Sequence, residues 1–132
     1  RAHWTEKVFP SVARNESVLF AAIQNNRAVG TVQLVLDMAP NQPHRCDVSK
    51  LLVHPDARRG GIARRLMAAM EERALEEGRR LVVLDTRTGD SAEGLYTSIG
   101  YETVGSLPGF ARDPFDPNKL DATTYMYKQL IV

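Results

Sequence analysis

Four arginines and two glycines occur together in a short stretch that joins an apolar segment to a run with helical spacing. They are Arg58, Arg59, Gly60, Gly61, Arg64 and Arg65. Glycine lets a backbone approach a ligand closely, and the first amide N–H groups of a helix have no partner within the helix, so such a helix start binds anions. Cations are otherwise unfavourable at this end of a helix. The pattern predicts a phosphate or pyrophosphate site, with simple solvation of the arginines as the alternative.

Two common phosphate motifs do not occur at this position. No Gly-Lys-Ser or Gly-Lys-Thr follows the glycines, and no G-x-G-x-x-G opens the helix. The first absence excludes a Walker A loop for nucleoside triphosphates, and the second argues against a dinucleotide-binding unit. The phosphate ligand therefore belongs to another class.

A resemblance to a known family narrows that class. Residues 58–63, with the sequence RRGGIA, resemble the R/Q-x-x-G-x-G/A acetyl-CoA signature of the GNAT superfamily of N-acetyltransferases. Residues 92–101, with the sequence AEGLYTSIGY, resemble the later A-x-x-x-Y-x-x-x-G-[FY] motif of the same family. The two motifs together are more specific than either alone. The resemblance implies that acetyl passes directly from acetyl-CoA to an amine.

The resemblance also implies which residues hold the cofactor. Val53 N–H would polarise the thioester carbonyl, beside a strand end that pairs with the pantetheine. Family members often carry Asn seven residues before the tyrosine of the second motif, and Gly89 stands there in this chain. Asp90 or Ser91 would have to replace that contact. The expected cofactor-binding residues are Leu51, Leu52, Val53, Arg58, Arg59, Gly60, Gly61, Ile62, Ala63, Arg64, Asp90 and Ser91.

Two side chains are the candidates for proton transfer. Tyr96 matches the general acid of the family, and the alternative is a tyrosine whose ring only packs on a sheet. Asp85 is the first candidate for the base, because it ends the apolar run 81–84, where a carboxylate would be partly buried. Its alternative role is to cap the following turn with Thr86. Weaker candidates are Glu102, Asp90 and His54.

A closer resemblance concerns the acceptor. The segments 84–86, 105–110 and 124–128, together with Tyr96, resemble the tabtoxin-resistance type of acetyltransferase, which acetylates a small toxin. We therefore expect a small-molecule amine as substrate, and the Pro-rich segment 107–120, read as a loop, could cover it. A protein or peptide N-acetyltransferase and a non-catalytic CoA-binding sensor are the alternatives.

The elements that position these residues follow from alternating hydrophobic periods. A helix is expected over residues 4–13, and a hairpin over 18–23 and 28–38 around Asn25-Asn26. The remaining elements are a strand over 47–53, a helix over 62–77, a strand over 81–84, a helix over 91–99 and strands over 101–104 and 124–131. This order predicts an α/β fold of the GNAT type, with a mixed, mostly antiparallel sheet flanked by helices. The resemblance implies that the family's N-terminal strand is absent here.

Composition limits the number of domains, the classes of partner and the cellular compartment that we expect. The 132 residues suit one domain, 1–132, and 17 Lys+Arg against 16 Asp+Glu give a net charge of only +1. We expect no nucleic-acid partner and no membrane partner, because no strong positive field and no apolar run of about 20 residues are present. The single cysteine, Cys46, predicts no disulfide within the chain, no thiolate metal site and a cytoplasmic location. A homodimer is left open.

Overall fold

The computed structural model describes residues 2–10, 16–58 and 61–131. It divides into two compact units, residues 1–82 with 129–132 and residues 83–128, which we describe separately. Helices combine with strands that pair mainly antiparallel in both units, as expected for the mixed α/β fold class. A single domain over the whole chain stays a prediction.

The first unit is built on four strands in the order β1-β2-β3-β4. They are β1 (Ala2–Pro10), β2 (Glu16–Gln24), β3 (Arg27–Val35) and β4 (Arg45–Val53). Each strand is antiparallel to its neighbour in this order. The hairpin expected around Asn25-Asn26 is confirmed, and both asparagines have positive φ, 53° and 62°, as a tight two-residue turn requires.

The strand β1 differs from the sequence-based expectation. A helix was expected over residues 4–13, together with a sheet that lacks the family's N-terminal strand, whereas Ala2–Pro10 pairs along its whole length with β2. Residues 11–13 lie outside the described residues. A short apolar run fits one face of a helix or of a strand, and here the open edge of β2 supplies backbone partners for a strand.

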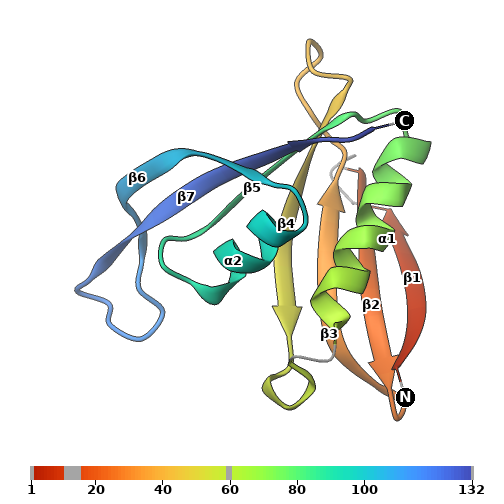
Figure 1. The fold of residues 1–132 in the computed structure, drawn as a ribbon, viewed down its shortest axis with the longest axis horizontal. Coiled ribbons are helices and arrows are strands. Elements are labelled where there is room, and N and C mark those ends of the chain that lie inside the picture. Colours follow the sequence, from red (N-terminus) through yellow and green to blue (C-terminus); the bar gives the residue numbers. More distant parts are fainter. Residues whose placement is uncertain (1, 11–15, 59–60, 132) are drawn as a thin grey trace. The chain divides into compact units, whose positions relative to one another are not determined.

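The helix α1 (Ile62–Glu76) packs on β2, β3 and β4 (Figure 1). Its buried face includes Leu66, Met67 and Met70, none of which has exposed surface. Burying each such side chain stabilises the fold by about 1.5–3 kcal/mol, so this stripe fixes the helix on the sheet. The helix ends beside Gly78, whose φ of 78° suits the left-handed position after a C-terminus. The expected helix over 62–77 is confirmed within one residue.

The second unit contains α2 (Ser91–Ser98) and β6 (Glu102–Arg112), together with most of β5 (Leu81–Arg87) and most of β7 (Leu120–Gln129). Its strands follow the order β5-β7-β6, and β6 and β7 form a long antiparallel hairpin (Figure 1). The helix α2 confirms the short helix expected from the sequence. The Pro-rich segment 107–120 is not one loop, because β6 continues to Arg112 and the connection to β7 spans only 113–119. Pro108 is tolerated because β6 is an edge strand with a register shift between Leu107 and Ala111.

Within the described parts of the chain, no helix is long and apolar enough to cross a membrane.

Candidate active site

The end of β4 is shaped by a bulge that the sequence did not reveal. Lys50 has a φ of 55°, in the left-handed region that side chains rarely adopt. The pairing with β3 shifts at this place, because Thr31 faces Leu52 but Gln33 faces Ser49. One extra residue on β4 therefore bends the strand just before Leu51–Val53. Bulges re-aim the backbone that follows them and are common beside active sites.

The amide of Val53 points away from β3. Val53 is the pairing partner of Gly30, and the next residue, His54, donates its N–H to the Val29 carbonyl at 2.7 Å. Hydrogen-bonded and non-hydrogen-bonded pairs alternate along an antiparallel ladder, so the N–H and C=O of Val53 face the opposite side of β4. On that side Arg58 Nε donates to the Val53 carbonyl at 3.3 Å. Arg58 thereby holds the turn after β4.

The start of α1 has the form of an anion-binding helix end. Gly61 occupies the N-cap with a φ of 79°, makes no side-chain cap and is followed by no acidic residue in the first turn. A Cβ atom built on Gly61 would meet no atom within 4 Å, so the space beside it is open. Ile62 is buried, Ala63 half-buried and Arg64 exposed. The expected residues Arg59 and Gly60 lie outside the described residues.

Gly30 on β3 keeps this helix start close to the sheet. A Cβ on Gly30 would lie 2.9 Å from Ile62 Cγ2, 3.1 Å from Leu66 Cδ1 and 3.3 Å from the Leu52 carbonyl oxygen. Only a residue without a side chain allows this approach. An isolated glycine within a strand is a recognisable signal of close backbone approach, which the sequence analysis did not use.

In the second unit, Tyr96 lies on the inner face of α2. Its side chain is 5% exposed, and its ring packs against Tyr101 with the centroids 5.8 Å apart. Burial, followed by the negative charges of Asp90 and Asp85, raises the pKa of Tyr96 to about 12. Both carboxylates are therefore close enough to the phenol to act on its ionisation. The phenol is protonated at neutral pH.

Asp85 lies near the end of β5, as expected, but it is not partly buried. Its side chain is exposed, and Oδ2 accepts a hydrogen bond from Thr123 Oγ1 at 2.8 Å. Thr123 Oγ1 also lies 3.1 Å from the carbonyl oxygen of Thr86. The expected burial is wrong because the apolar run ends at Leu84, and Asp85 and Arg87, on one face of the last part of β5, are both exposed. The carboxylate is oriented by Thr123 rather than by a cavity.

Asp90 and Ser91 begin α2 and face solvent. The Asp90 carboxylate accepts from the N–H of Ser91 at 2.9 Å, which makes it the N-cap. The carboxylate of Glu93 accepts from the N–H of Gly89, where φ is 84°. These contacts fix the turn that precedes Tyr96, and they leave the Ser91 hydroxyl exposed at the surface.

Lys128 was missed by the sequence analysis. Its Nζ donates to the carbonyl of Ile99, the C-cap of α2, at 2.8 Å and lies 5.7 Å from the ring centroid of Tyr101. Gly100, with a φ of 104°, leaves room for this side chain, because a Cβ there would lie 3.2 Å from Lys128 Cε. No sequence signal separates this lysine from a solvated one.

Cys46 and His54 have structural roles. Cys46 is fully buried, and its burial raises the pKa of the thiol to about 12, which makes it a small apolar side chain and no nucleophile. His54 is exposed, and its Nδ1 accepts from the N–H of Asp56 at 3.1 Å, capping the short 3-10 helix Pro55–Ala57.

The model of the acetyltransferase (GNAT) family matches residues 1–101, so the chain belongs to that family. Membership confirms the expected class, an N-acetyltransferase that uses acetyl-CoA. Family membership does not show whether the acceptor amine belongs to a small molecule or to a protein.

Solved structures share the fold. A ribosomal-protein-alanine N-acetyltransferase from Brucella melitensis is 24% identical with a TM-score of 0.75, and the match covers 86% of this chain and 69% of that one. An aminoglycoside 6'-acetyltransferase type Ii is 23% identical with a TM-score of 0.70, covering 88% and 70%. The acetyltransferase yncA from Salmonella typhimurium, solved with acetyl-CoA, is 19% identical with a TM-score of 0.76, covering 88% and 66%.

Proposed function

We propose that the chain transfers acetyl from acetyl-CoA directly to the amine of a small molecule. The observation that carries the donor side is the start of α1, where Gly61 combines a left-handed φ with open space and the first turn has no acidic residue. Such a helix end suits a pyrophosphate. Arg64, exposed beside it, supplies positive charge, and Arg58 braces the turn.

The end of β4 suits the acyl part of the donor. The N–H of Val53 faces away from β3 and is the candidate to hydrogen-bond the thioester carbonyl as negative charge develops on its oxygen. Leu51 to Val53 would pair with the pantetheine amides as an added strand does. The bulge at Lys50 sets the direction of this segment.

Tyr96 would act on the leaving sulfur. In the reaction the amine nitrogen bonds to the acetyl carbon, the carbon–sulfur bond breaks, and the thiolate leaves with the electron pair. Because the pKa of Tyr96 is about 12 and a thiol has one near 8.5, complete proton transfer from the phenol would be uphill by about 5 kcal/mol. We infer that Tyr96 donates a hydrogen bond that stabilises the thiolate, and that the proton lost by the nitrogen as the amide forms reaches the sulfur through solvent.

Asp85 would receive a different proton, the one that an ammonium ion loses before its nitrogen attacks. A protonated amine must lose a proton before it attacks, and the exposed, Thr123-oriented carboxylate of Asp85 is open to an ammonium ion or to a water that relays the proton. Asp90 adds a second negative charge near Tyr96. The two carboxylates favour a cationic acceptor over an anionic one.

The proposed acceptor, a small-molecule amine, rests on individual residues and not on the fold. The proposal of a small-molecule acceptor is supported by the resemblance to the tabtoxin-resistance type of acetyltransferase, which acts on a small toxin. That resemblance includes Asp85, Tyr96 and the segments 105–110 and 124–128. The fold relatives include enzymes named for a ribosomal protein and for an aminoglycoside, so fold alone favours neither acceptor. The buried free thiol of Cys46 supports a reducing compartment such as the cytoplasm.

A ligand series tests the donor. Acetyl-CoA at about 100 times its Kd should stabilise the fold by about 2.7 kcal/mol and raise Tm by several degrees, whereas NAD and ATP should not. Gly61→Asp should abolish the acetyl-CoA shift, because it strains a left-handed position and adds negative charge at the phosphate site. A shift with NAD or ATP and none with acetyl-CoA would reject the donor assignment.

Turnover tests the acceptor. A panel of small amines and of N-terminal peptides should show acetyl-CoA-dependent acetylation of small amines. Tyr96→Phe removes the hydrogen bond to the thiolate and should lower kcat by about 10²-fold, while the affinity for acetyl-CoA stays unchanged. Acetylation of peptides alone would assign the chain to the protein-directed class. Binding of acetyl-CoA with no turnover of either class would favour a CoA sensor.

A further inference from the structure

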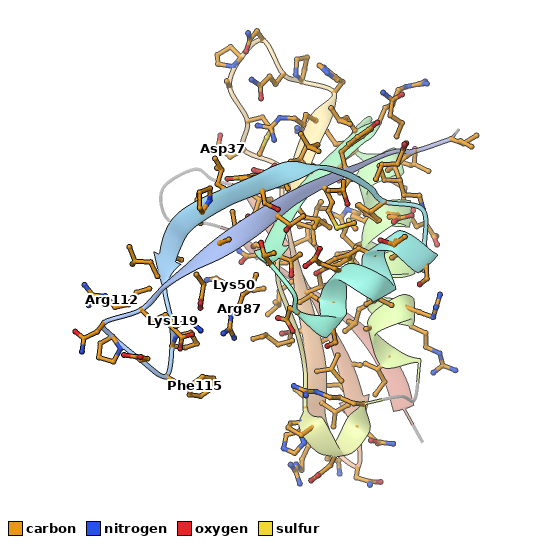
Figure 2. The ribbon with its side chains drawn as sticks, turned by 60° about the vertical axis from the view of Figure 1, so that its left-hand side comes forward. Asp37, Lys50, Arg87, Arg112, Phe115 and Lys119 are labelled. Carbon is orange, nitrogen blue, oxygen red and sulfur yellow. The ribbon has the colours of Figure 1, made fainter. Side chains whose placement is uncertain are left out.

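The connection between β6 and β7 carries a phenylalanine that is almost fully exposed. Phe115 has 89% of its surface exposed, and Phe110 and Leu120 on the two strands are 49% and 63% exposed. Phe115 lies at the end of the hairpin, and Arg87 and Lys119 lie nearby (Figure 2). Scattered apolar side chains on a surface are ordinary, but a large ring that is almost fully exposed and held at a fixed place suits a contact surface.

The backbone beneath Phe115 is held by a buried carboxylate. Asp113 is 6% exposed, and its Oδ1 accepts from the N–H of Phe115 at 2.8 Å and from that of Asp116 at 3.1 Å. The N–H of Asp113 donates to the carbonyl of Lys119, which closes the connection. Side-chain to backbone hydrogen bonds of this kind define a fixed turn. The ring is therefore presented by a turn with a set conformation.

The same carboxylate is tied to the strand of the candidate base. Arg87 Nη2 donates to Asp113 Oδ2 at 3.0 Å, and Arg87 Nε lies 3.1 Å from Asp121 Oδ2. Successive side chains of a strand alternate between its faces, so Arg87 and Asp85 share one face of β5, about 7 Å apart along the strand. Arg87 thus connects the turn that presents Phe115 to the face of β5 that carries Asp85.

The charges around this turn are balanced. Asp113 and Asp121 face Arg87 and Lys119, whose Nζ lies 4.0 Å and 3.9 Å from the two carboxylates. Because these charges pair with one another, the turn offers the exposed ring of Phe115 as its apolar contact, while the carboxylate of Asp85 favours an ammonium ion.

We propose that Phe115, fixed through Asp113 and Arg87, contacts an apolar or aromatic group of the acceptor several bonds from its amine. This inference rests on the proposed function and makes Phe115 a specificity residue. The acceptor would then be an amine with a separate hydrophobic part. The salt bridge between Arg87 and Asp113 would hold the ring in place.

A matched pair of amines tests the proposal by binding, without the need for turnover. Calorimetry should show that 4-phenylbutylamine binds about tenfold more tightly than n-butylamine, because a favourable aromatic contact adds to the buried area. Phe115→Ala should remove most of this preference and leave n-butylamine unchanged. Val104→Ala, at a β6 residue that is 69% exposed, is the control and should keep the preference.

A second variant tests whether the salt bridge between Arg87 and Asp113 holds the Phe115 ring in place. Arg87→Gln should reduce the phenylbutylamine preference as Phe115→Ala does, with circular dichroism to verify folding, while Kd for acetyl-CoA stays unchanged. Equal binding of both amines to the wild type, or a preference that survives Phe115→Ala, overturns the inference. A phenyl preference without acetylation of either amine supports the binding role of Phe115 and counts against the proposed transfer reaction.

Discussion

Lys128 Nζ lies 2.8 Å from the carbonyl oxygen of Ile99, so a lysine from β7 completes the C-terminus of the helix that carries Tyr96. The same ammonium group lies 5.7 Å from the ring centroid of Tyr101, and Tyr101 packs on Tyr96. A cation at a helix C-terminus is favourable for the helix dipole. This chain of contacts fixes the end of the helix and the aromatic neighbour of Tyr96 together.

Removing this lysine should impair catalysis without impairing donor binding. Lys128→Met leaves a helix carbonyl without its charged donor and ends the contact with the ring of Tyr101, so we expect an unfolding free energy lower by about 2 kcal/mol. If Tyr96 shifts with its helix, kcat should fall roughly tenfold while Kd for acetyl-CoA is unchanged. Lys128→Arg, which keeps a cationic donor, should restore most of kcat. A loss of stability with normal kcat would restrict Lys128 to a structural role.

The ionisation of Tyr96 should be visible in a spectrophotometric titration. The chain has four tyrosines, and one should ionise with a pKa of about 12 that is absent in Tyr96→Phe. The unfolded chain loses this proton near pH 10 and the folded chain does not, so the free energy of unfolding should fall by about 2–3 kcal/mol between pH 10 and 12. Below pH 10 the wild type and Tyr96→Phe should show parallel pH dependence of stability. Ionisation of all four tyrosines near pH 10 would contradict the burial.

Asp85→Asn should produce a defect that depends on pH. Near neutral pH an alkylamine is almost fully protonated, so loss of a proton acceptor should lower kcat/KM by about 10²-fold. The defect should shrink as the pH approaches the pKa of the amine, because the free amine then needs no base. Thr123→Val, which removes the hydroxyl that orients Asp85, should give a smaller defect with the same pH trend. A defect of equal size at all pH values would assign Asp85 to structure alone.

A side chain at Gly30 should weaken acetyl-CoA binding from outside the site. The Cβ of Gly30→Ala would meet Ile62 and Leu66 at 2.9 and 3.1 Å and the backbone of Leu52 at 3.3 Å, which forces the start of α1 away from β3. Such overpacking costs about 1–3 kcal/mol of stability, and Kd for acetyl-CoA should rise as the helix start moves. Gly105→Ala is the matched control, since its Cβ would meet no atom within 4 Å. Equal effects of the two substitutions would contradict the packing argument.

Local rules were sufficient for much of the chain. Helix α1 follows from an apolar stripe at helical spacing with Gly78 behind it, and the hairpin of β2 and β3 from Asn25-Asn26 between alternating strands. These signals depend on residues three or four positions apart, or on a turn of two residues, so they survive without tertiary context. The two motifs of residues 58–63 and 92–101 likewise indicated the family before any coordinates, because each is a short pattern of fixed spacing.

Other features depend on residues far apart in the sequence. Residues 2–10 have apolar positions that suit a helix, yet the free edge of β2 makes them a strand. The bulge at Lys50 exists only opposite β3, and the exposure of Asp85 depends on where β5 leaves the buried part of its sheet. Arg87 and Asp113, like Lys128 and Ile99, are separated by 26 and 29 residues. A sequence by itself determines what each side chain can do, whereas chain folding alone decides which distant partner is present, because long-range contacts are set by packing and not by local conformation.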